Sequence, residues 1–161
     1  MAIEENKMTK ESAGLMMYKV EKDVLKVFLV HPGGPFWKSK EDGAWSIPKG
    51  EIEDEENLLE TAKREFKEEV GFEAKGNFIS LGKIQQKAGK IVHAWAFEGD
   101  WSGILMCQSF VEIEWPLRSG KKIKIPEVDK ARFFSIEDAK KKINQAQKEL
   151  IERLEKTLDD N

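Results

Sequence analysis

The sequence predicts an α/β fold in which a sheet packs against helices. Two observations support this prediction. Short runs rich in apolar and β-branched residues recur along the chain, and two segments of helical character accompany them, at 57–70 and from Ile136 onward. The length of 161 residues and the apolar fraction of 40% suit one hydrophobic core. We therefore expect a single domain over residues 1–161, with residues 1–12 as a flexible N-terminal segment.

The first elements are expected to form a β-hairpin. Residues 13–20 and 24–31 are rich in apolar residues and are separated by three charged residues, Glu21-Lys22-Asp23. The glycines and prolines of 31–35 then break the second strand and open a loop through Gly43. A short strand at 44–47 should end at Pro48-Lys49-Gly50, where the chain turns sharply.

The middle and end of the chain alternate between helix and strand. A helix is expected at about 57–70, ended by Gly71 in a left-handed conformation. Residues 78–86 and 90–97 should pair around Ala88-Gly89, while 110–115 and 131–134 are weaker strand candidates. Ser135 can cap a second helix, which we expect to break near Asn144.

Three glutamates of the first helix stand out. Glu65, Glu68 and Glu69 lie on one face of a helix, beside an apolar stripe of Leu59, Ala62, Phe66 and Val70. Carboxylates at these spacings repel one another, so a cation such as Mg²⁺ or Mn²⁺ would stabilise them. A solvated acidic face is the alternative, and spacing alone leaves both open.

The residues around these glutamates favour the metal site. The stretch 50–72 resembles the signature of the Nudix hydrolases, whose fixed positions are filled here by Gly50, Glu56, Arg64, Glu65, Phe66, Glu68, Glu69, Gly71 and Phe72. Every fixed position of the signature matches. The resemblance implies the Nudix form of the fold, an α/β/α sandwich with a mixed sheet and a loop-helix-loop catalytic motif.

The resemblance also implies roles for the residues of this motif. Glu68 and Glu69 are the principal expected metal ligands, Glu65 is a further ligand or orients water, and the backbone carbonyl of Lys49 joins them beside Gly50. One to three Mg²⁺ or Mn²⁺ ions are expected. Arg64 is expected to act mainly as a fork that pairs with Glu56 and holds the loop against the helix.

The implied reaction is hydrolysis of a phosphate anhydride by water attack at phosphorus. Glu68 or Glu65 is the first candidate for the general base, and Glu127, from a downstream loop, is the rival. An exposed acid without a catalytic role is the alternative for Glu127. A Nudix fold used only for binding or regulation is the alternative for the whole chain, but such modules lose the glutamates that are retained here.

Substrate choice depends on residues outside the motif. The segment 45–50, Trp-Ser-Ile-Pro-Lys-Gly, is similar to the motif entry in diadenosine tetraphosphate hydrolases and in nucleotide-sanitising members. It favours dinucleoside polyphosphates or nucleoside triphosphates, with Lys49, Trp45, Glu127 and His31 as candidate substrate contacts. Three departures weaken the match to particular members: Glu51 replaces a usual histidine, and neither the tyrosine of tetraphosphate hydrolases nor the proline of ADP-ribose pyrophosphatases is found downstream. Inositol pyrophosphates and RNA 5′ ends remain alternatives.

Composition limits the partners and the location. The net charge of -3 does not favour a broad nucleic-acid-binding surface, although 118–142 carries nine basic residues against four acids. The single Cys107 excludes an internal disulfide and a cysteine-based zinc cluster. No signal peptide, membrane-spanning run or lipidation motif is found, so we expect a cytoplasmic protein without a membrane partner. The sequence leaves the oligomeric state open.

Overall fold

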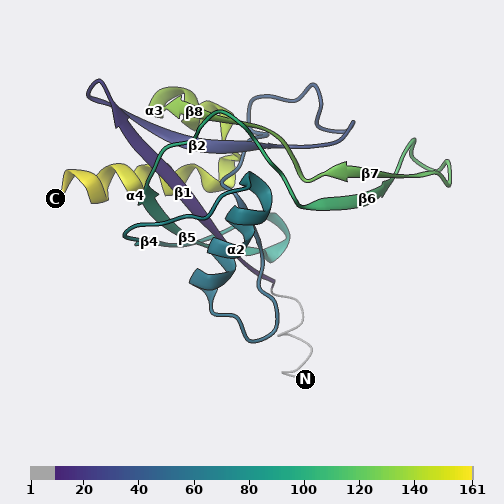
Figure 1. Ribbon diagram of the computed structural model, residues 1–161, viewed down its shortest axis with the longest axis horizontal. Helices are drawn as coiled ribbons and strands as arrows, with labels where there is room; N and C mark the ends of the chain where they lie inside the picture. Colours follow the sequence, from purple (N-terminus) through teal and green to yellow (C-terminus); the bar gives the residue numbers. More distant parts are fainter. Residues whose placement is uncertain (1–9, 161) are drawn as a thin grey trace.

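A mixed sheet forms the centre of the computed structural model, which describes residues 10–160 (Figure 1). Its strand order is β4-β5-β1-β2-β8, and β3 pairs with β1 beside this path. β1 is parallel to β5 and antiparallel to β2 and β3. The strands are β1 Glu11–Glu21, β2 Val24–Pro32, β3 Lys49–Glu51, β4 Ile79–Gln85, β5 Ile91–Glu98 and β8 Val128–Ser135.

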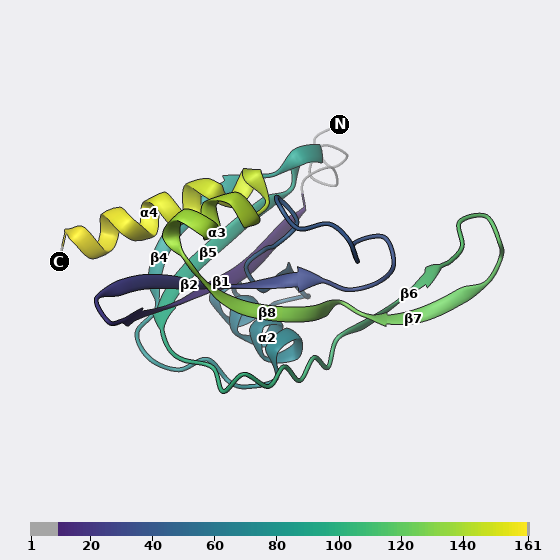
Figure 2. The same cartoon turned by 90° about the horizontal axis from the view of Figure 1, so that it is seen from above.

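Helices cover both faces of this sheet (Figure 2). The helix α2 (Leu58–Val70) packs on one face, while α3 (Ile136–Lys142) and α4 (Lys148–Asp159) lie on the other. Short 3-10 turns occur at Lys87–Gly89 and Gln145–Gln147. The α/β class and the helix-covered mixed sheet are confirmed.

Alternating side chains of β1 build the two halves of the core. Leu15 and Met17 point into the cluster that contains Phe66 of α2, whereas Met16 and Tyr18 belong to the cluster beneath α3 and α4. This is the two-residue period of a strand that is covered on both faces. Burying a side chain the size of Phe66 stabilises the fold by roughly 1.5–3 kcal/mol. The apolar face of α2, which includes Phe66, therefore holds the helix on the sheet.

The caps of α2 set its limits. Asn57 precedes the helix, and its Oδ1 accepts the backbone N–H of Glu60 at 2.9 Å. Gly71 follows the helix with a φ of 99°, in the left-handed region, and its N–H donates to the carbonyl of Lys67. The predicted bounds of this helix and its glycine cap are confirmed.

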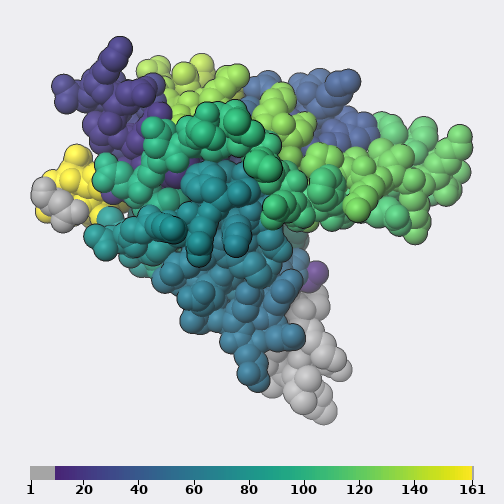
Figure 3. All heavy atoms as spheres, in the orientation of Figure 1, coloured from purple at the N-terminus to yellow at the C-terminus, as the bar shows by residue number. Residues whose placement is uncertain are grey.

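A two-stranded hairpin projects from the body of the protein. It consists of β6 (Phe110–Glu114) and β7 (Lys122–Pro126), which pair only with each other. Figures 1 and 2 show it extending away from the sheet, and the space-filling view in Figure 3 shows the same projection. It leads directly into β8, because Glu127 is the one residue between β7 and β8.

Several sequence-based boundaries need correction. β1 begins at Glu11, so residues 11 and 12 are not part of a flexible segment; the rest of that prediction, for residues 1–9, lies outside the described residues. Residues 44–47 contribute isolated bridges from Trp45 and Ser46 in place of a strand. The sequence patterns do not predict β3 or β7. The break near Asn144 is confirmed, because α3 and α4 are separate helices.

The two flanks of that break hold the segment before the motif. The N–H of Trp45 donates to the carbonyl of Lys142, and the N–H of Asn144 donates to the carbonyl of Trp45. The helix must therefore open at this point to leave backbone groups free for pairing. None of the helices between residues 10 and 160 has the length and apolar character needed to cross a membrane.

Candidate active site

The motif begins where β3 meets α2. β3 is fixed by antiparallel pairing with β1, with Gly14 opposite Lys49. A β-carbon added to Gly50 would overlap the carboxyl group of Glu65, so the absence of a side chain at residue 50 lets α2 place this carboxylate directly against the strand. The structure therefore supplies a steric reason for Gly50, one that its place in the motif did not reveal.

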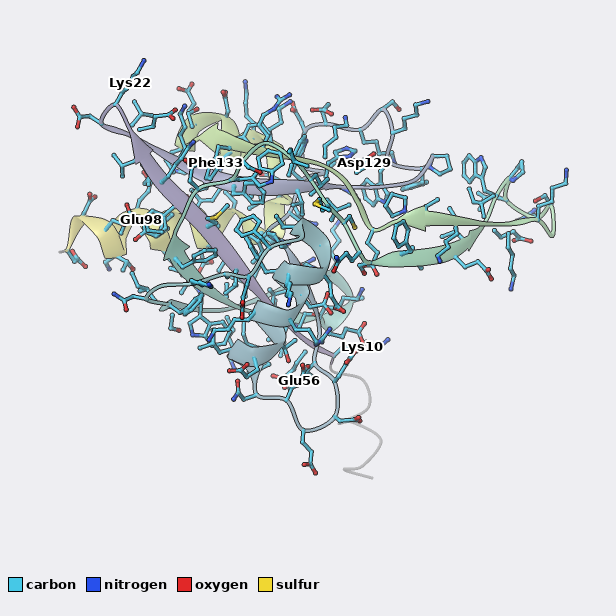
Figure 4. The ribbon with its side chains drawn as sticks, viewed as in Figure 1. Lys10, Lys22, Glu56, Glu98, Asp129 and Phe133 are labelled. Atoms are coloured by element: carbon cyan, nitrogen blue, oxygen red, sulfur yellow. The ribbon has the colours of Figure 1, made fainter. Side chains whose placement is uncertain are left out.

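Arg64 joins the loop before α2 to the acidic face of the helix. Its Nε donates to Glu56 at 2.7 Å, and its terminal nitrogens donate to Glu56, Glu65 and Glu68 at 3.0, 2.7 and 2.9 Å. It also donates to the carbonyl of Glu51 at 3.2 Å. The predicted pairing of Arg64 with Glu56 is present in the structure. Figure 4 labels Glu56 in the loop that Arg64 holds.

The charge of Arg64 changes the titration of its partner. Its hydrogen bonds hold the pKa of Glu56 at about 2, well below the ordinary carboxyl value. Thr61 also donates to Glu56 through its hydroxyl at 3.0 Å. Glu56 is thus ionised, and its carboxylate holds the loop before α2 through hydrogen bonds from Thr61 and Arg64 of that helix. Its role is structural.

Glu69 is the buried member of the acidic face. Its side chain is almost fully enclosed, with the residue 4% exposed. Burial raises the pKa of its carboxyl well above the ordinary value, and the nearby carboxylates of Glu65 and Glu127 raise it further. Lys49 opposes these effects through its charge and through its backbone N–H, which donates to Glu69. A buried carboxylate among other carboxylates is stabilised by a nearby cation.

Glu65 and Lys49 share this environment. Burial raises the pKa of Glu65, while its hydrogen bond with Arg64 acts in the opposite direction. Burial lowers the pKa of the Lys49 amine, against the attraction of Glu69, Glu65 and Glu51. The charges of β3 and α2 are therefore coupled within one partly enclosed region.

Glu127 reaches the same region from the loop between β7 and β8. Its charge acts on both Glu65 and Glu69, and the hydroxyl of Ser109 donates to its Oε1 at 2.8 Å. Glu68, in contrast, is more exposed and lies with Arg64 at the outer edge of the cluster. Glu65 and Glu127 are 62 positions apart along the chain but lie in the same region of the structure. Sequence spacing alone could not establish this proximity.

The donor chemistry of this cluster fits a hard divalent cation. Glu65, Glu68, Glu69 and the Lys49 carbonyl offer oxygen atoms only, and the close approach of Glu65 to Gly50 brings a carboxylate beside that carbonyl's peptide. Within residues 10–160, no group of three or more acidic, histidine or cysteine side chains is arranged so that it could hold a metal ion. Arg64 engages Glu65 and Glu68 instead.

A pocket opens beside this cluster. It has a volume of about 230 Å³, and Lys49, Glu69 and Glu127 line its charged end. Its other lining residues include Trp37, Ser46, Gln86, Asn144 and Gln147. A second depression, of about 470 Å³, continues from Lys49 and Glu127 past Glu65 to Lys90. The carboxylates therefore lie where two accessible spaces meet.

Sequence reasoning missed the residues that complete these spaces. Lys90 follows the turn before β5, and Gln86, Asn144 and Gln147 come from two distant segments. The buried Gln147 accepts the N–H of Ile47 at 3.1 Å and donates to Ser46 and Gln86 at 3.0 and 3.2 Å. No local pattern marks these residues, because their meeting depends on the packing of the helix pair against the sheet.

The structure corrects the expectation that Trp45 and His31 contact substrate. Trp45 is 1% exposed and packs edge-on against Phe134, with ring centroids 4.9 Å apart. His31 is fully buried. Both side chains are enclosed by the core, so neither presents a surface on which a substrate could rest.

His31 instead pins the loop that follows β2. Its Nε2 donates to the carbonyl of Lys40 at 2.7 Å, and its Nδ1 lies 3.0 Å from the carboxylate of Asp129. The carbonyl of Lys40 can only accept, so Nε2 is the donor in this hydrogen bond. Figure 4 labels Asp129, which belongs to β8.

Comparison with solved structures supports this fold. The chain resembles a C. elegans Ap4A hydrolase complex with a TM-score of 0.67 and 19% identity, covering 93% of this chain and 99% of that one. It also resembles the NUDIX domain of Shewanella oneidensis NrtR complexed with ADP ribose, with a TM-score of 0.67 and 16% identity over 93% and 88% of the two chains. The E. coli ORF135 protein matches with a TM-score of 0.57 and 23% identity over 91% and 89%.

Sequence comparison identifies the family. No curated protein sequence gives a significant match. The profile of the NUDIX domain, however, matches residues 8–154, which is most of the chain and includes every motif residue described above. The chain therefore belongs to the Nudix family of hydrolases.

Proposed function

We propose that this Nudix enzyme hydrolyses a phosphate anhydride of a nucleoside polyphosphate with the help of Mg²⁺ or Mn²⁺. The observation that carries the proposal is that Lys49 and Glu127 line both the pocket that contains Glu69 and the adjoining depression that contains Glu65. Nudix hydrolases generally use divalent metal ions, and phosphate anhydride cleavage requires neutralised charge and an oriented water molecule.

The residues of α2 and β3 would hold the metal. Glu65, Glu68, Glu69 and the carbonyl of Lys49 are the proposed ligands, one to three ions being bound. When bound, the metal neutralises phosphate charge and acidifies a water molecule. Arg64 and Glu56 keep the loop fixed to the helix, so the ligands on the two elements stay in register.

Two carboxylates are the main candidates for the group that takes the proton from water. Glu65 lies in the depression that continues past Lys49, and Glu127 lines both this depression and the pocket. Glu68 is a weaker candidate, since it is turned toward Arg64 at the edge of the cluster. Attack by water at phosphorus then breaks the anhydride bond, and the leaving phosphate takes the bonding electrons.

Two lysines support binding of the phosphate chain. Lys49 and Lys90 both line the depression that contains Glu65, so their ammonium groups can bind phosphates outside the reach of the metal. Substrates with several consecutive phosphates should therefore be preferred over compounds with two phosphates, such as ADP-ribose. Diadenosine tetraphosphate and nucleoside triphosphates, including oxidised forms, are the first candidates.

A substrate screen with Mg²⁺ and Mn²⁺, with products identified by chromatography, tests the proposal. Longer nucleoside polyphosphates should be turned over most efficiently, and Lys49→Ala should weaken them more than shorter substrates. Lys67→Ala, on the exposed side of α2, is the matched control and should behave like the wild type. ADP-ribose turnover at least as efficient as that of every longer substrate would refute the phosphate-chain preference. Turnover confined to inositol pyrophosphates or RNA 5′ ends would refute the nucleotide assignment.

A further inference from the structure

A third space, a groove of about 440 Å³, adjoins the pocket lined by Lys49, Glu69 and Glu127, which we call the catalytic pocket. It lies between the loop after β2 and the β6–β7 hairpin, and it shares Pro32, Trp37 and Glu127 with the catalytic pocket. Among the described residues that line it, Glu127 alone carries a charge. The groove is therefore continuous with the phosphate-binding region, but its own walls suit an uncharged group.

One wall is the apolar face of the hairpin. The strand register pairs Val111 with Ile125 and Ile113 with Ile123, and because side chains alternate these four share one face. The opposite face carries the pairs Glu112–Lys124 and Glu114–Lys122. Val111 remains 42% exposed, so the aliphatic face is only partly covered by the protein itself.

The other wall is an aromatic pair in the loop. Phe36 and Trp37 pack edge to face, with ring centroids 5.1 Å apart, and both line the groove. Phe36 is 52% exposed and Trp37 is 36% exposed. The ammonium group of Lys40, which is not among the lining residues, lies 3.8 Å from the centroid of the Phe36 ring and steadies it. Exposed aromatic rings that face an aliphatic wall are typical of a site for a planar ligand.

Backbone contacts hold these two walls at a fixed separation. The N–H of Gly33 donates to the carbonyl of Glu127 at 3.1 Å, and the N–H of Glu127 donates to the carbonyl of Ser109 at 2.9 Å. A β-carbon on Gly33 would overlap the carbonyl of Pro126, so this glycine permits the close approach. His31 fixes the far end of the loop through the carbonyl of Lys40. These contacts thus fix the shape of the groove.

We propose that this groove binds the nucleobase ring of the substrate. The ring lies between the aromatic pair and the aliphatic face, and the phosphate chain passes Trp37 and Glu127 to reach Lys49 and the carboxylates. This inference rests on the proposed function for the identity of the ligand. It adds a specificity site that the Nudix signature does not contain, and it makes Phe36 and Trp37 the residues that select base-containing substrates.

The test separates binding of the ring from catalysis. Adenosine monophosphate and ribose 5-phosphate are titrated into the metal-free protein while NMR signals of the tryptophan side-chain N–H groups are followed. The wild type should bind the ring-containing probe more tightly and shift the Trp37 signal. Phe36→Ala and Trp37→Ala should each weaken adenosine monophosphate binding by about tenfold, as expected for loss of base stacking, and leave ribose 5-phosphate binding unchanged.

Phe110→Ala is the matched control. Phe110 is an exposed aromatic residue of the same hairpin, but it is not among the residues that line the groove. It should bind both probes as the wild type does. Equal affinity of the wild type for the two probes, or unchanged binding in both groove variants, would overturn the inference. Sedimentation of the same proteins gives a further check. A wild-type dimer that becomes monomeric in the Phe36 and Trp37 variants but not in Phe110→Ala would show that the groove is a self-association surface, and would also overturn the inference.

Turnover assays keep the two proposals distinguishable. Normal turnover of nucleoside polyphosphates together with ring-independent binding would refute the groove and leave the proposed function standing. Ring binding that depends on Phe36 and Trp37, without turnover of any polyphosphate, would support the groove and refute the proposed function.

Discussion

The carboxyl group of Glu65 lies where the side chain of residue 50 would begin, and only a glycine at this position leaves room for it. Gly50 belongs to β3 and Glu65 to α2, so this contact fixes the distance between the strand and the helix that supply the proposed metal ligands. A motif that reads as a linear pattern thus encodes a steric fit between two elements.

The first prediction concerns this fit. Gly50→Ala should displace the Glu65 carboxylate and lower kcat by about tenfold or more, because small misplacement of a positioned group is costly in catalysis. Steady-state kinetics of Gly50→Ala, Glu65→Ala and the double variant measure the coupling. The losses of the single variants should not add in the double variant, since both act through the same carboxylate. Fully additive losses would show that Gly50 acts by another route.

The second prediction concerns the acidic face of α2. Glu69→Gln and Glu68→Gln should each lower kcat by about a hundredfold or more, because metal-assisted charge neutralisation contributes several kcal/mol to barrier lowering. Circular dichroism should show that both variants remain folded. Glu60→Gln, on the exposed side of the same helix, is the control and should retain wild-type kinetics. Near-normal activity of both variants at ordinary metal concentrations would exclude these two residues as essential ligands.

The third prediction concerns the loop anchor at Glu56. Its folded-state pKa of about 2 lies below its ordinary value, so its ionised form stabilises the fold above the unfolded carboxyl pKa, roughly 4.3, and this contribution is lost as pH falls through about 2. Glu56→Gln should therefore be less stable than wild type at neutral pH, and the difference should shrink below about pH 4. Urea unfolding over this range measures it. A stability difference that stays constant with pH would contradict an ionised anchor.

The fourth prediction concerns His31. His31→Ala should lower the free energy of unfolding by about 1–3 kcal/mol, because it leaves the Lys40 carbonyl and the Asp129 carboxylate without their buried partner. Hydrogen exchange should show faster exchange in the loop through Gly43. His93→Ala, which removes another histidine–carboxylate pair at a more exposed position, is the control. Unchanged exchange in this loop would show that His31 does not hold it.

The sequence predicts the structure of the 50–72 motif better than the pocket residues that come from distant segments. The helix at 57–70, its glycine cap and the pairing of Arg64 with Glu56 depend on local spacing, which one chain displays directly. β7 could have been recognised from the alternation of lysine and isoleucine in 122–125, but the short length of this run and its charge obscured the signal.

Long-range packing accounts for the rest. Trp45 and His31 follow recognisable motif and strand signals, yet their burial depends on β8 and the helix pair, which cover them. Lys90 and Gln147 reach the site only because distant segments meet at one end of the sheet. The loop position of Glu127 makes it a candidate base, but its approach to Glu65 depends on how β7 leads into β8. Local sequence patterns carry no information about such contacts between distant segments.

The most direct test of the central claim is the fate of water during catalysis. Diadenosine tetraphosphate, or the best substrate from the screen, is hydrolysed with Mg²⁺ in isotopically labelled water, and the products are analysed by mass spectrometry. Metal-dependent attack at phosphorus predicts label in a phosphate-containing product, on the phosphoryl oxygen, and no reaction when the metal is chelated. Label on a sugar or base carbon, or undiminished hydrolysis without metal, would contradict the account.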